Sequence, residues 1–395
     1  MTPPETVRGE GACAGIRVLD LSRLLPGPLC SLLLADMGAE VIKIEDPRGG
    51  DWLRWMPPMT GSMSRVFAGL NRDKLSVALD LKKPEDVESF RALAAEADVV
   101  IESFRPGVMD RLGVGPESLL AANPRLIYCA ITGYGQTGPH AHRAGHDINF
   151  LALSGLLAHN GVQGGDPVVP GFQGADIGGG TYLAAMRILA ALLERERTGR
   201  GAMLDVSMTR GAAGRATLSA LEALANDAEE ARGEGLLAGS RACYRTYATK
   251  DGQYMALGAL EPVFWGRFCE AAGRPDWVSR QMEGGEEGAA LVQEVSALFR
   301  TKTREEWVAL FEPLDLCCEP VLSLLESMEH PAVTGGGSAR FLVKDGEGNE
   351  FEMLRTALLS EGAAAHATPA PGLGEHPKAV LSALGQATGG EPEDA

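Results

Sequence analysis

The sequence lacks several patterns that would assign a function at once. Its seven cysteines include no C-x-x-C spacing, which argues against a redox or zinc motif and is typical of reduced thiols in the cytoplasm. No H-E-x-x-H occurs, so the sequence gives no support for a metal centre. No Gly-x-Gly-x-x-Gly follows the first predicted strand, and a nicotinamide dinucleotide is therefore not indicated either.

Targeting and membrane signals are missing as well. Residues 1–11 are polar and acidic, so we expect neither a signal peptide nor a transit peptide there. We find no apolar run that approaches the ~20 residues of a transmembrane helix. The formal net charge of −17 argues against binding to nucleic acid or to an anionic membrane. We therefore expect a cytoplasmic protein in which any phosphorylated ligand is held by local basic groups.

What the sequence does contain is a regular alternation of strands and helices. Strands are predicted at residues 16–21, 40–45, 75–81, 99–103, 126–131 and 202–208. Helices are predicted at about 29–37, 84–97 and 181–198, and residues 24–28 are predicted as a turn. This alternation predicts an α/β fold with a Rossmann-like, doubly wound and mostly parallel sheet.

A second region differs in character. Hairpins are predicted at residues 244–257 and 341–353, with helices near 262–272, 289–301 and 304–310. Since 395 residues exceed one hydrophobic core, two domains are expected. The predicted division is a large Rossmann-like domain at residues 1–226, a charged and glycine-rich linker at 227–243, a smaller α+β domain at 244–340, and a C-terminal segment at 341–395 that returns to the large domain and ends in a disordered tail.

Two side chains stand out as candidates for proton transfer. His146 lies in the motif GHDINF at 145–150, and Asp176 lies in GADIGGG at 174–180. An imidazole titrates near neutral pH, and burial can tune a carboxyl group toward that range. If the two face each other across a pocket, they can remove a proton from one side of a carbon and return it on the other. The structural alternative for Asp176 is a helix N-cap.

These two motifs, together with others in the same order, resemble the class III CoA-transferase superfamily and, within it, the α-methylacyl-CoA racemases. The resemblance covers roughly residues 15–331. The further motifs are LDLS at 19–22, PGP at 26–28, DMGAEVIKIE at 36–45, NRDK at 71–74, DLK at 80–82, ESFRPGV at 102–108 and TGYGQTGP at 132–139. The histidine of GHDINF favours the racemases over the transferases.

The resemblance implies an isomerase that inverts the α-carbon of 2-methylacyl-CoA thioesters by two-base proton transfer through an enolate. His146 and Asp176 would act on opposite faces of that carbon, and Glu261 would orient the histidine. An equal alternative for Glu261 is an acidic residue at a helix start before Pro262. No cofactor is implied, because CoA is part of the substrate.

The glycines at 178–180 have an expected role in this chemistry. At a helix start they would offer free N–H groups to the enolate oxygen and would let the thioester approach the backbone. Burial would raise the pKa of Asp176 and a helix N-terminus would lower it, and the sequence leaves the outcome open.

The resemblance also implies positions for CoA contacts, mostly in the loops that follow the strands, and Asp147 is expected to hold its loop. The predicted contact residues are Arg48, Arg72, Lys74, Leu79, Asp80, Leu81, Lys82, Ser103, Phe104, Arg105, Pro106, Gly107, Arg111, Gly145, Asp147, Gly178 and Gly179. An interlocked homodimer is implied too, with Glu261 of one chain near His146 of the other.

Two other functions remain open. In a CoA transferase, Asp176 would be the nucleophile and His146 would have no role. A CoA-thioester binding protein would bind without turnover, and no feature of the sequence favours it.

Overall fold

The computed structural model describes residues 11–376, which form two compact units. Unit 1 consists of residues 11–154, 171–215 and 331–376, and unit 2 consists of residues 155–170 and 216–330. The division predicted from the sequence placed its boundaries at 226 and 340 and did not assign residues 155–170 to the smaller part. The predicted disordered tail lies largely outside the described residues.

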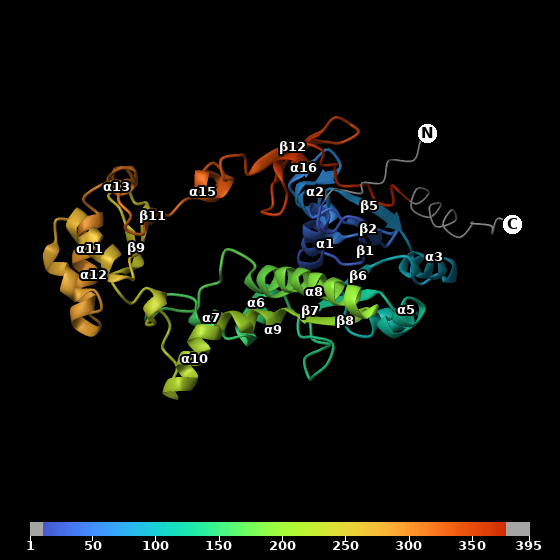
Figure 1. Cartoon of the computed structure of the whole chain (residues 1–395), viewed down its shortest axis with the longest axis horizontal. Coiled ribbons are helices and arrows are strands. Elements are labelled where there is room, and N and C mark those ends of the chain that lie inside the picture. Colours follow the sequence, from blue (N-terminus) through green and yellow to red (C-terminus); the bar gives the residue numbers. More distant parts are fainter. Residues whose placement is uncertain (1–10, 377–395) are drawn as a thin grey trace. The chain divides into compact units, whose positions relative to one another are not determined.

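Unit 1 is built on a six-stranded sheet in which all neighbouring strands are parallel. The order is β5-β2-β1-β6-β7-β8. The strands are β1 (Arg17–Asp20), β2 (Glu40–Glu45), β5 (Lys74–Ala78), β6 (Val99–Glu102), β7 (Ile127–Thr132) and β8 (Ala202–Ser207) (Figure 1). The α/β fold with a parallel sheet is thus confirmed, and every predicted strand is present within a few residues of its expected bounds.

The helices of unit 1 cover both faces of this sheet. On one face, Phe90 and Leu119 pack onto strand residues such as Leu19 and Tyr128 in one apolar cluster. The other face carries α1 and α8, which contact each other. The longer helices are α1 (Pro26–Asp36), α2 (Arg65–Asn71), α3 (Pro84–Ala95), α5 (Pro116–Ala122), α6 (Asp147–Leu153), α8 (Tyr182–Thr198) and α9 (Met208–Ala213), and the π-helical segment η2 (Gly174–Thr181) leads into α8.

Helix α1 begins earlier than predicted. Residues 24–28 were expected to form a turn, but Pro26 is the first residue of the helix and Pro28 lies in its first turn. Proline is tolerated there because its missing N–H would have no partner in the first turn. Gly38 follows the helix with φ +96°, a left-handed conformation that suits glycine and ends the helix as expected.

The helical run Gly174–Thr198, formed by η2 and α8, corrects the expectation that no apolar run approaches membrane-span length. By length and composition alone it is long and apolar enough to cross a membrane, and 44% of its apolar window of 18 residues is buried inside the protein. Its neighbours in unit 1 include α1, β7 and β8. The predicted helix began only at Thr181, because the glycines before it were not expected to be helical.

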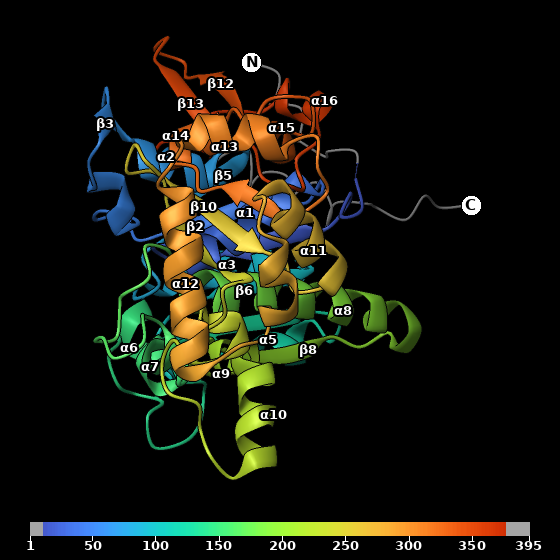
Figure 2. The ribbon, with the colours of Figure 1, turned by 90° about the vertical axis from the view of Figure 1, so that its left-hand side faces the viewer.

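The C-terminal part of unit 1 packs onto the edge of the sheet next to α2. Its strands β12 (Arg340–Lys344) and β13 (Glu350–Leu354) form a hairpin, which is labelled in Figure 2. The hairpin buries Val343, Phe351 and Met353 in one apolar cluster with Phe67 of α2. Arg54 donates to the carbonyl oxygen of Pro371 at 3.0 Å. The remaining short elements of unit 1 are η1 (Trp52–Trp55), β3 (Met59–Thr60), β4 (Met63–Ser64), α4 (Val108–Arg111), α15 (Pro331–Thr334) and α16 (Glu361–Ala364).

Unit 2 has its own sheet and its own aromatic core. The predicted hairpin is confirmed as β9 (Tyr244–Ala248) and β10 (Tyr254–Gly258), and β11 (Cys318–Pro320) pairs with β10. Trp265, Trp277, Trp307, Phe268 and Phe299 are fully buried together. The other elements are α7 (Leu156–His159), α10 (Thr217–Asn226), η4 (Leu236–Ala238), α11 (Pro262–Ala271), η5 (Pro275–Arg280), α12 (Gly285–Phe299), α13 (Arg304–Phe311) and α14 (Leu324–Ser327). The short helix η3 (Gly214–Ala216) lies where the chain passes from unit 1 to unit 2.

The segment predicted as a linker is bound within unit 2. Arg232 donates to the carbonyl oxygen of Ala158 at 2.7 Å and to that of Gly165. Gln163 donates to Glu234 at 3.0 Å. These bonds tie residues 229–239 to residues 155–170, which explains why the latter belong to this unit.

Candidate active site

A cavity of about 460 Å³ in unit 1 holds both predicted proton-transfer residues in its walls. The chain adds β2 and β5 on one side of β1 and then crosses over to add β6 on the other side. The order in which strands are added therefore reverses between β1 and β6. Ligands of open α/β sheets bind outside the carboxyl ends of strands at such a point. The cavity is lined by Arg23, Leu24, Pro26, Ser103, Phe104, Arg105, Pro106, Ile131, Thr132, Gly133, Ala141, Arg143, Ala144, Gly145, His146, Asn149, Phe150, Asp176 and Met208.

Unit 2 contains a larger cavity of about 770 Å³, but size alone does not identify a site. Its histidine, His159, is paired with Glu229 at 3.0 Å. The smaller cavity is the better candidate, because it combines an imidazole, a carboxyl group and arginines at the functional edge of a parallel sheet.

His146 is placed by the start of helix α6. It is the residue before the helix, with extended backbone, and its N–H donates to the side-chain oxygen of Asn149 at 3.0 Å. Behind it, a methyl group at Gly145 would collide with the ring of Phe150 and the hydroxyl of Tyr134. The side chain of His146 is exposed at the cavity, where a ligand can reach it.

Asp176 lies in the first turn of η2, and Asp147 fixes the backbone around it. One carboxylate oxygen of Asp147 accepts the N–H groups of Ala175 at 2.7 Å and of Asp176 at 2.8 Å. Asp147 therefore links the histidine motif to the aspartate motif. This agrees with the expectation that it holds its loop, although its partner is the other motif.

The pKa of Asp176 is raised to about 6. Burial is the largest cause, the nearby charge of Asp147 adds to it, and His146 acts in the opposite direction. The sequence left the direction of this shift open, and in the structure the pKa is raised. A carboxyl group with such a pKa is protonated in an appreciable fraction of molecules near neutral pH and can serve as acid or base.

The glycines of η2 lie close to neighbouring parts of unit 1. A methyl group on Gly179 would lie 2.5 Å from the carbonyl oxygen of Met208, so Gly179 permits close packing of η2 against α9. A methyl group on Gly178 would meet the guanidinium of Arg215. The N–H groups of residues 175 and 176, at the start of η2, are bonded to Asp147. The predicted role of the N–H groups of residues 178–180 toward an enolate oxygen stays a prediction.

Two predicted CoA contacts are also wrong. Arg72 is fully buried and paired with Asp36 and Asp73 at 2.6 Å. Lys74 is 3% exposed and donates to Asn71 at 2.9 Å and to Asp20 at 3.2 Å. Arg72 precedes β5 and Lys74 is its first residue, so the backbones of both lie at the amino end of that strand. Their charges are used inside the protein and are not available to a ligand.

The other predicted contacts follow the carboxyl ends of the strands. The loop after β6 contributes Ser103, Phe104, Arg105 and Pro106 to the cavity wall, followed by Gly107 and Arg111 just outside it. The remaining group follows β2 and β5 and does not line the cavity: Arg48, Leu79, Asp80, Leu81 and Lys82. Arg48 is exposed and pairs with Asp46 at 2.6 Å.

Sequence reasoning missed several lining residues. Arg23 and Leu24 follow β1, and the rule that ligands bind at the carboxyl edge of the sheet could have indicated them. Arg143 lies three positions before His146. Arg23, Arg105 and Arg143 are exposed, and none of them forms an ion pair with a carboxylate of residues 11–376. They concentrate positive charge at the cavity of an acidic protein.

Glu261 lies in unit 2, at the position before α11. Pro262 is the first residue of that helix, as predicted, and the Glu261 side chain is exposed and makes no capping hydrogen bond. Its predicted pairing with His146 of another chain stays a prediction.

Comparison with known proteins agrees with this arrangement. Residues 13–377 match CoA-transferase family III. The chain is 36% identical over 371 residues to the alpha-methylacyl-CoA racemase of Mus musculus, which covers 94% of this chain and 93% of that protein. It is 35% identical over 376 residues to the succinyl-CoA:glutarate CoA-transferase of Mus musculus, and the match covers 93% of this chain and 85% of that protein. A CAIB/BAIF family protein from Brucella suis has a solved structure with a TM-score of 0.81 at 30% identity, covering 95% of this chain and 100% of that one. The resemblance seen in the motifs is confirmed, and the chain belongs to CoA-transferase family III.

Proposed function

We propose that the protein is an α-methylacyl-CoA racemase, which inverts the α-carbon of 2-methylacyl-CoA thioesters. The observation that carries the proposal is that His146 and Asp176 line one cavity and that the pKa of Asp176 is raised to about 6. A carboxyl group that exists in both protonation states near neutral pH, in one cavity with an imidazole, suits a reaction that runs in both directions.

The reaction consists of two proton transfers at one carbon. In one direction, ionised Asp176 takes the α-proton, the electrons of the C–H bond pass into the thioester as an enolate, and protonated His146 donates a proton to the opposite face. In the other direction, neutral His146 takes the proton and protonated Asp176 returns one. No atom is gained or lost, and the two groups exchange protonation states.

The charge distribution supports a CoA thioester as the substrate. CoA carries several phosphate charges, while the protein has a formal net charge of −17, so binding requires local cations. Arg23, Arg105 and Arg143 supply them at the cavity. The same cavity offers apolar surface for the acyl group, from Leu24, Pro26, Ile131, Phe150 and Met208.

A CoA transferase is the second candidate, and a specific observation favours it. Asp176 lies in the cavity wall, and one transferase relative is 35% identical over 93% of this chain. Its carboxylate would attack the thioester carbonyl, form a mixed anhydride and release CoA as a thiolate. The thiolate would then attack the Asp176 acyl carbon, release the first acid and form an enzyme thioester, from which a second carboxylic acid takes the CoA. His146 has no role in this scheme.

Incubation with one enantiomer of a 2-methylacyl-CoA in deuterated water separates the two functions. The racemase is expected to incorporate deuterium at the α-carbon and to lose the optical purity of the substrate. Transfer of CoA to an added carboxylic acid, with the α-proton retained, would reject the racemase in favour of the transferase. Absence of both reactions would reject both proposals.

A further inference from the structure

One residue that lines the cavity, Leu24, has an unusual backbone conformation. Leu24 lies between β1 and α1 with φ +64°, a left-handed conformation that costs a residue with a side chain about one order of magnitude in population. Its side chain is 37% exposed and lines the cavity beside Pro26. A leucine keeps such a conformation only where neighbouring groups hold it.

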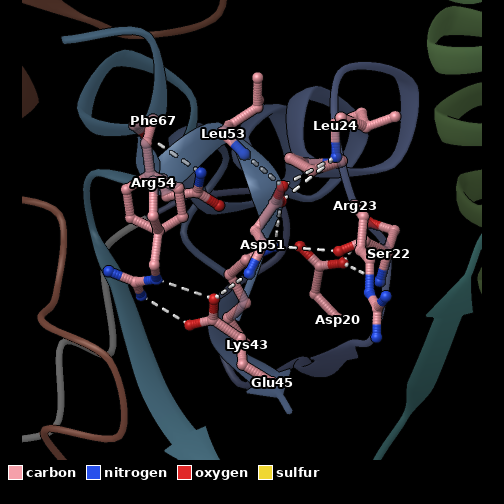
Figure 3. Close-up of polar contacts among 12 residues, drawn as sticks. Asp20, Ser22, Arg23, Leu24, Lys43, Glu45, Asp51, Leu53, Arg54 and Phe67 are labelled. Atoms are coloured by element: carbon pink, nitrogen blue, oxygen red, sulfur yellow. Dashed lines mark hydrogen bonds and ion pairs between the residues drawn. The ribbon is translucent and has the colours of Figure 1, made fainter. Parts of the chain in front are cut away.

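Backbone groups of three consecutive residues, Ser22 to Leu24, are held by three different parts of unit 1. Figure 3 shows how Lys43 and Asp51 lie against this segment. The carbonyl oxygen of Ser22 accepts from the ammonium of Lys43 on β2 at 2.9 Å. The N–H of Arg23 donates to the hydroxyl of Ser103 after β6 at 3.1 Å. The N–H of Leu24 donates to both carboxylate oxygens of Asp51 at 3.2 Å.

The carboxylate of Asp51, which accepts the N–H of Leu24, is itself held firmly in place. It is 1% exposed, and its charge is balanced by Lys43 at 3.2 Å, whose side chain is fully buried. It also accepts the N–H of Leu53 at 3.0 Å, and its own N–H donates to Glu45 at 3.0 Å. The carboxylate is thus fixed from several directions, and its reach to Leu24 crosses from the loop after β2 to the loop after β1.

We propose that Asp51 is a positioning residue, which holds Leu24 in the left-handed conformation and so shapes the wall that Leu24 shares with His146 and Asp176. The proposal rests on the function proposed above, since the wall is taken to receive the acyl group of a CoA thioester. A leucine held in place there limits where the α-carbon can lie relative to the two proton-transfer groups.

A double-mutant cycle tests the coupling between the two residues. Asp51→Asn keeps the size of the side chain and removes its charge, and Leu24→Gly removes the cost of the left-handed backbone. Asp51→Asn should lower kcat/KM for α-proton exchange about tenfold in the natural protein and less than about threefold in the Leu24→Gly background. The same fold loss in both backgrounds would mean that Asp51 does not act through Leu24 and would overturn the proposal.

A matched control separates positioning from general loss of stability. Asp36 is also a fully buried carboxylate on a buried cation, Arg72, and lies at the far end of α1 from the cavity. Asp36→Asn should lower the melting temperature as Asp51→Asn does and leave kcat/KM unchanged. A fall in kcat/KM of the same size in Asp36→Asn would also overturn the proposal.

Amide hydrogen exchange gives a readout that does not depend on the reaction. Exchange at Leu24 should accelerate at least about tenfold in Asp51→Asn and remain unchanged in Asp36→Asn. Unchanged exchange in Asp51→Asn overturns the proposal, whatever the activity. If the natural protein catalyses neither proton exchange nor CoA transfer, the proposed function fails. The affinity for free CoA is then measured in place of kcat/KM in the same four proteins of the double-mutant cycle.

A second variant covers the case in which Asp51→Asn does not fold. Leu24→Val changes an exposed position and leaves Asp51 intact, but a β-branched residue tolerates a positive φ less well than leucine. Leu24→Met is its unbranched control. Leu24→Val should lower kcat/KM several-fold relative to Leu24→Met, and equal values for the two would contradict the proposal.

Discussion

At the scale of single residues, the pair Asp147 and Asp176 sets the proton chemistry. Both carboxyl groups belong to the same small region, because Asp147 accepts the N–H of Asp176 at 2.8 Å. Burial and this second negative charge together raise the pKa of Asp176 to about 6. Asp147 therefore has two effects: it fixes the backbone at Asp176 and makes that carboxyl group a stronger proton acceptor.

Replacing Asp147 with Asn should lower the pKa of Asp176. The amide keeps an oxygen for the N–H groups of Ala175 and Asp176, so the geometry is preserved while the like charge is removed. Asp176 acts as a base only when ionised, so the acidic limb of the pH profile for its half-reaction should move to lower pH. The measurement is the α-proton exchange rate from about pH 4 to 8. A limb that stays in place would show that the charge of Asp147 does not influence Asp176.

Glu102, which directly precedes the cavity loop after β6, gives a test by stability. It is 4% exposed, and its carboxyl group accepts the N–H of Phe104 at 2.6 Å. Burial raises its pKa from 4.5 to about 8. The folded protein therefore holds this proton where the unfolded chain releases it, and stability is lost as the pH rises from about 4.5 through about 8.

Glu102→Gln should remove this pH dependence, since the amide stays neutral. The variant should match the natural protein below about pH 4.5 and become more stable above it, by about 1–3 kcal/mol at pH 8. Urea unfolding at several pH values measures the difference. If the two proteins depend on pH in the same way over this range, Glu102 is ionised in the folded state and the interpretation is wrong.

The sequence predicted part of the site at this scale, and the reasons are physical. His146 and Asp176 could be identified because glycine-rich, apolar surroundings make a lone imidazole and a lone carboxyl group conspicuous. Arg72 and Lys74 were misassigned as CoA contacts. The sequence shows their positive charges but does not show that each charge is paired inside the protein, with Asp36 and with Asp20. Arg23 was missed, although its place just after β1, at the carboxyl edge of the sheet, could have indicated it.

At the scale of elements, the contact of η2 with α9 is the tightest feature near the site. Gly179 faces α9, and a methyl group built on it would lie 2.5 Å from one backbone oxygen and 2.7 Å from the backbone nitrogen of Ala212. On the other side, a methyl group on Gly211 would lie 2.2 Å from the carbonyl oxygen of Gly179. Glycine on both helices lets the two backbones touch, which positions the segment that carries Asp176.

Gly179→Ala should destabilise unit 1 by about 2–3 kcal/mol, because backbone atoms on both sides cannot move aside. Gly69→Ala is the matched control: Gly69 is also helical, lies in α2 and has open space around it. That substitution should be neutral or should stabilise by about 0.5–1 kcal/mol. Thermal unfolding compares the two, and equal stability of both variants would contradict the close contact.

The elements themselves were largely predictable, and the departures have local causes. Six strands were identified because short β-branched runs alternate with helices at regular spacing. The start of α1 was misplaced, because Pro26 and Pro28 indicate a turn as well as a first helical turn. The π-helical segment η2 carries no signal of its own in the sequence, since three glycines in a row disfavour a helix unless a neighbouring element packs on them.

At the scale of the whole molecule, several helices present apolar residues to solvent. In unit 1, α8 exposes Tyr182, Met186 and Leu193 to 57%, 62% and 68%. In unit 2, α10 exposes Leu221 and Leu224 to 58% and 80%. Apolar stripes of this kind are typical of surfaces that a further chain covers. They are consistent with the predicted homodimer.

The dimer makes a simple prediction about mass. Light scattering at micromolar concentration should give twice the chain mass of 41.6 kDa. Glu261→Gln should lower the rate of the half-reaction in which His146 is the base and leave the mass unchanged. A monomeric mass, or a Glu261→Gln variant with both half-reactions intact, would reject the shared site.

The two-base account is tested most directly by measuring α-proton exchange from each enantiomer separately in His146→Ala and Asp176→Asn. Each variant should lose exchange from the enantiomer whose proton its missing base removes, and net racemisation should fall by roughly 10²–10⁴ in both. CoA affinity should be kept, because the arginines at the cavity are unchanged. If His146→Ala racemises at the natural rate while Asp176→Asn abolishes CoA transfer between acids, the account is contradicted and the protein is a CoA transferase.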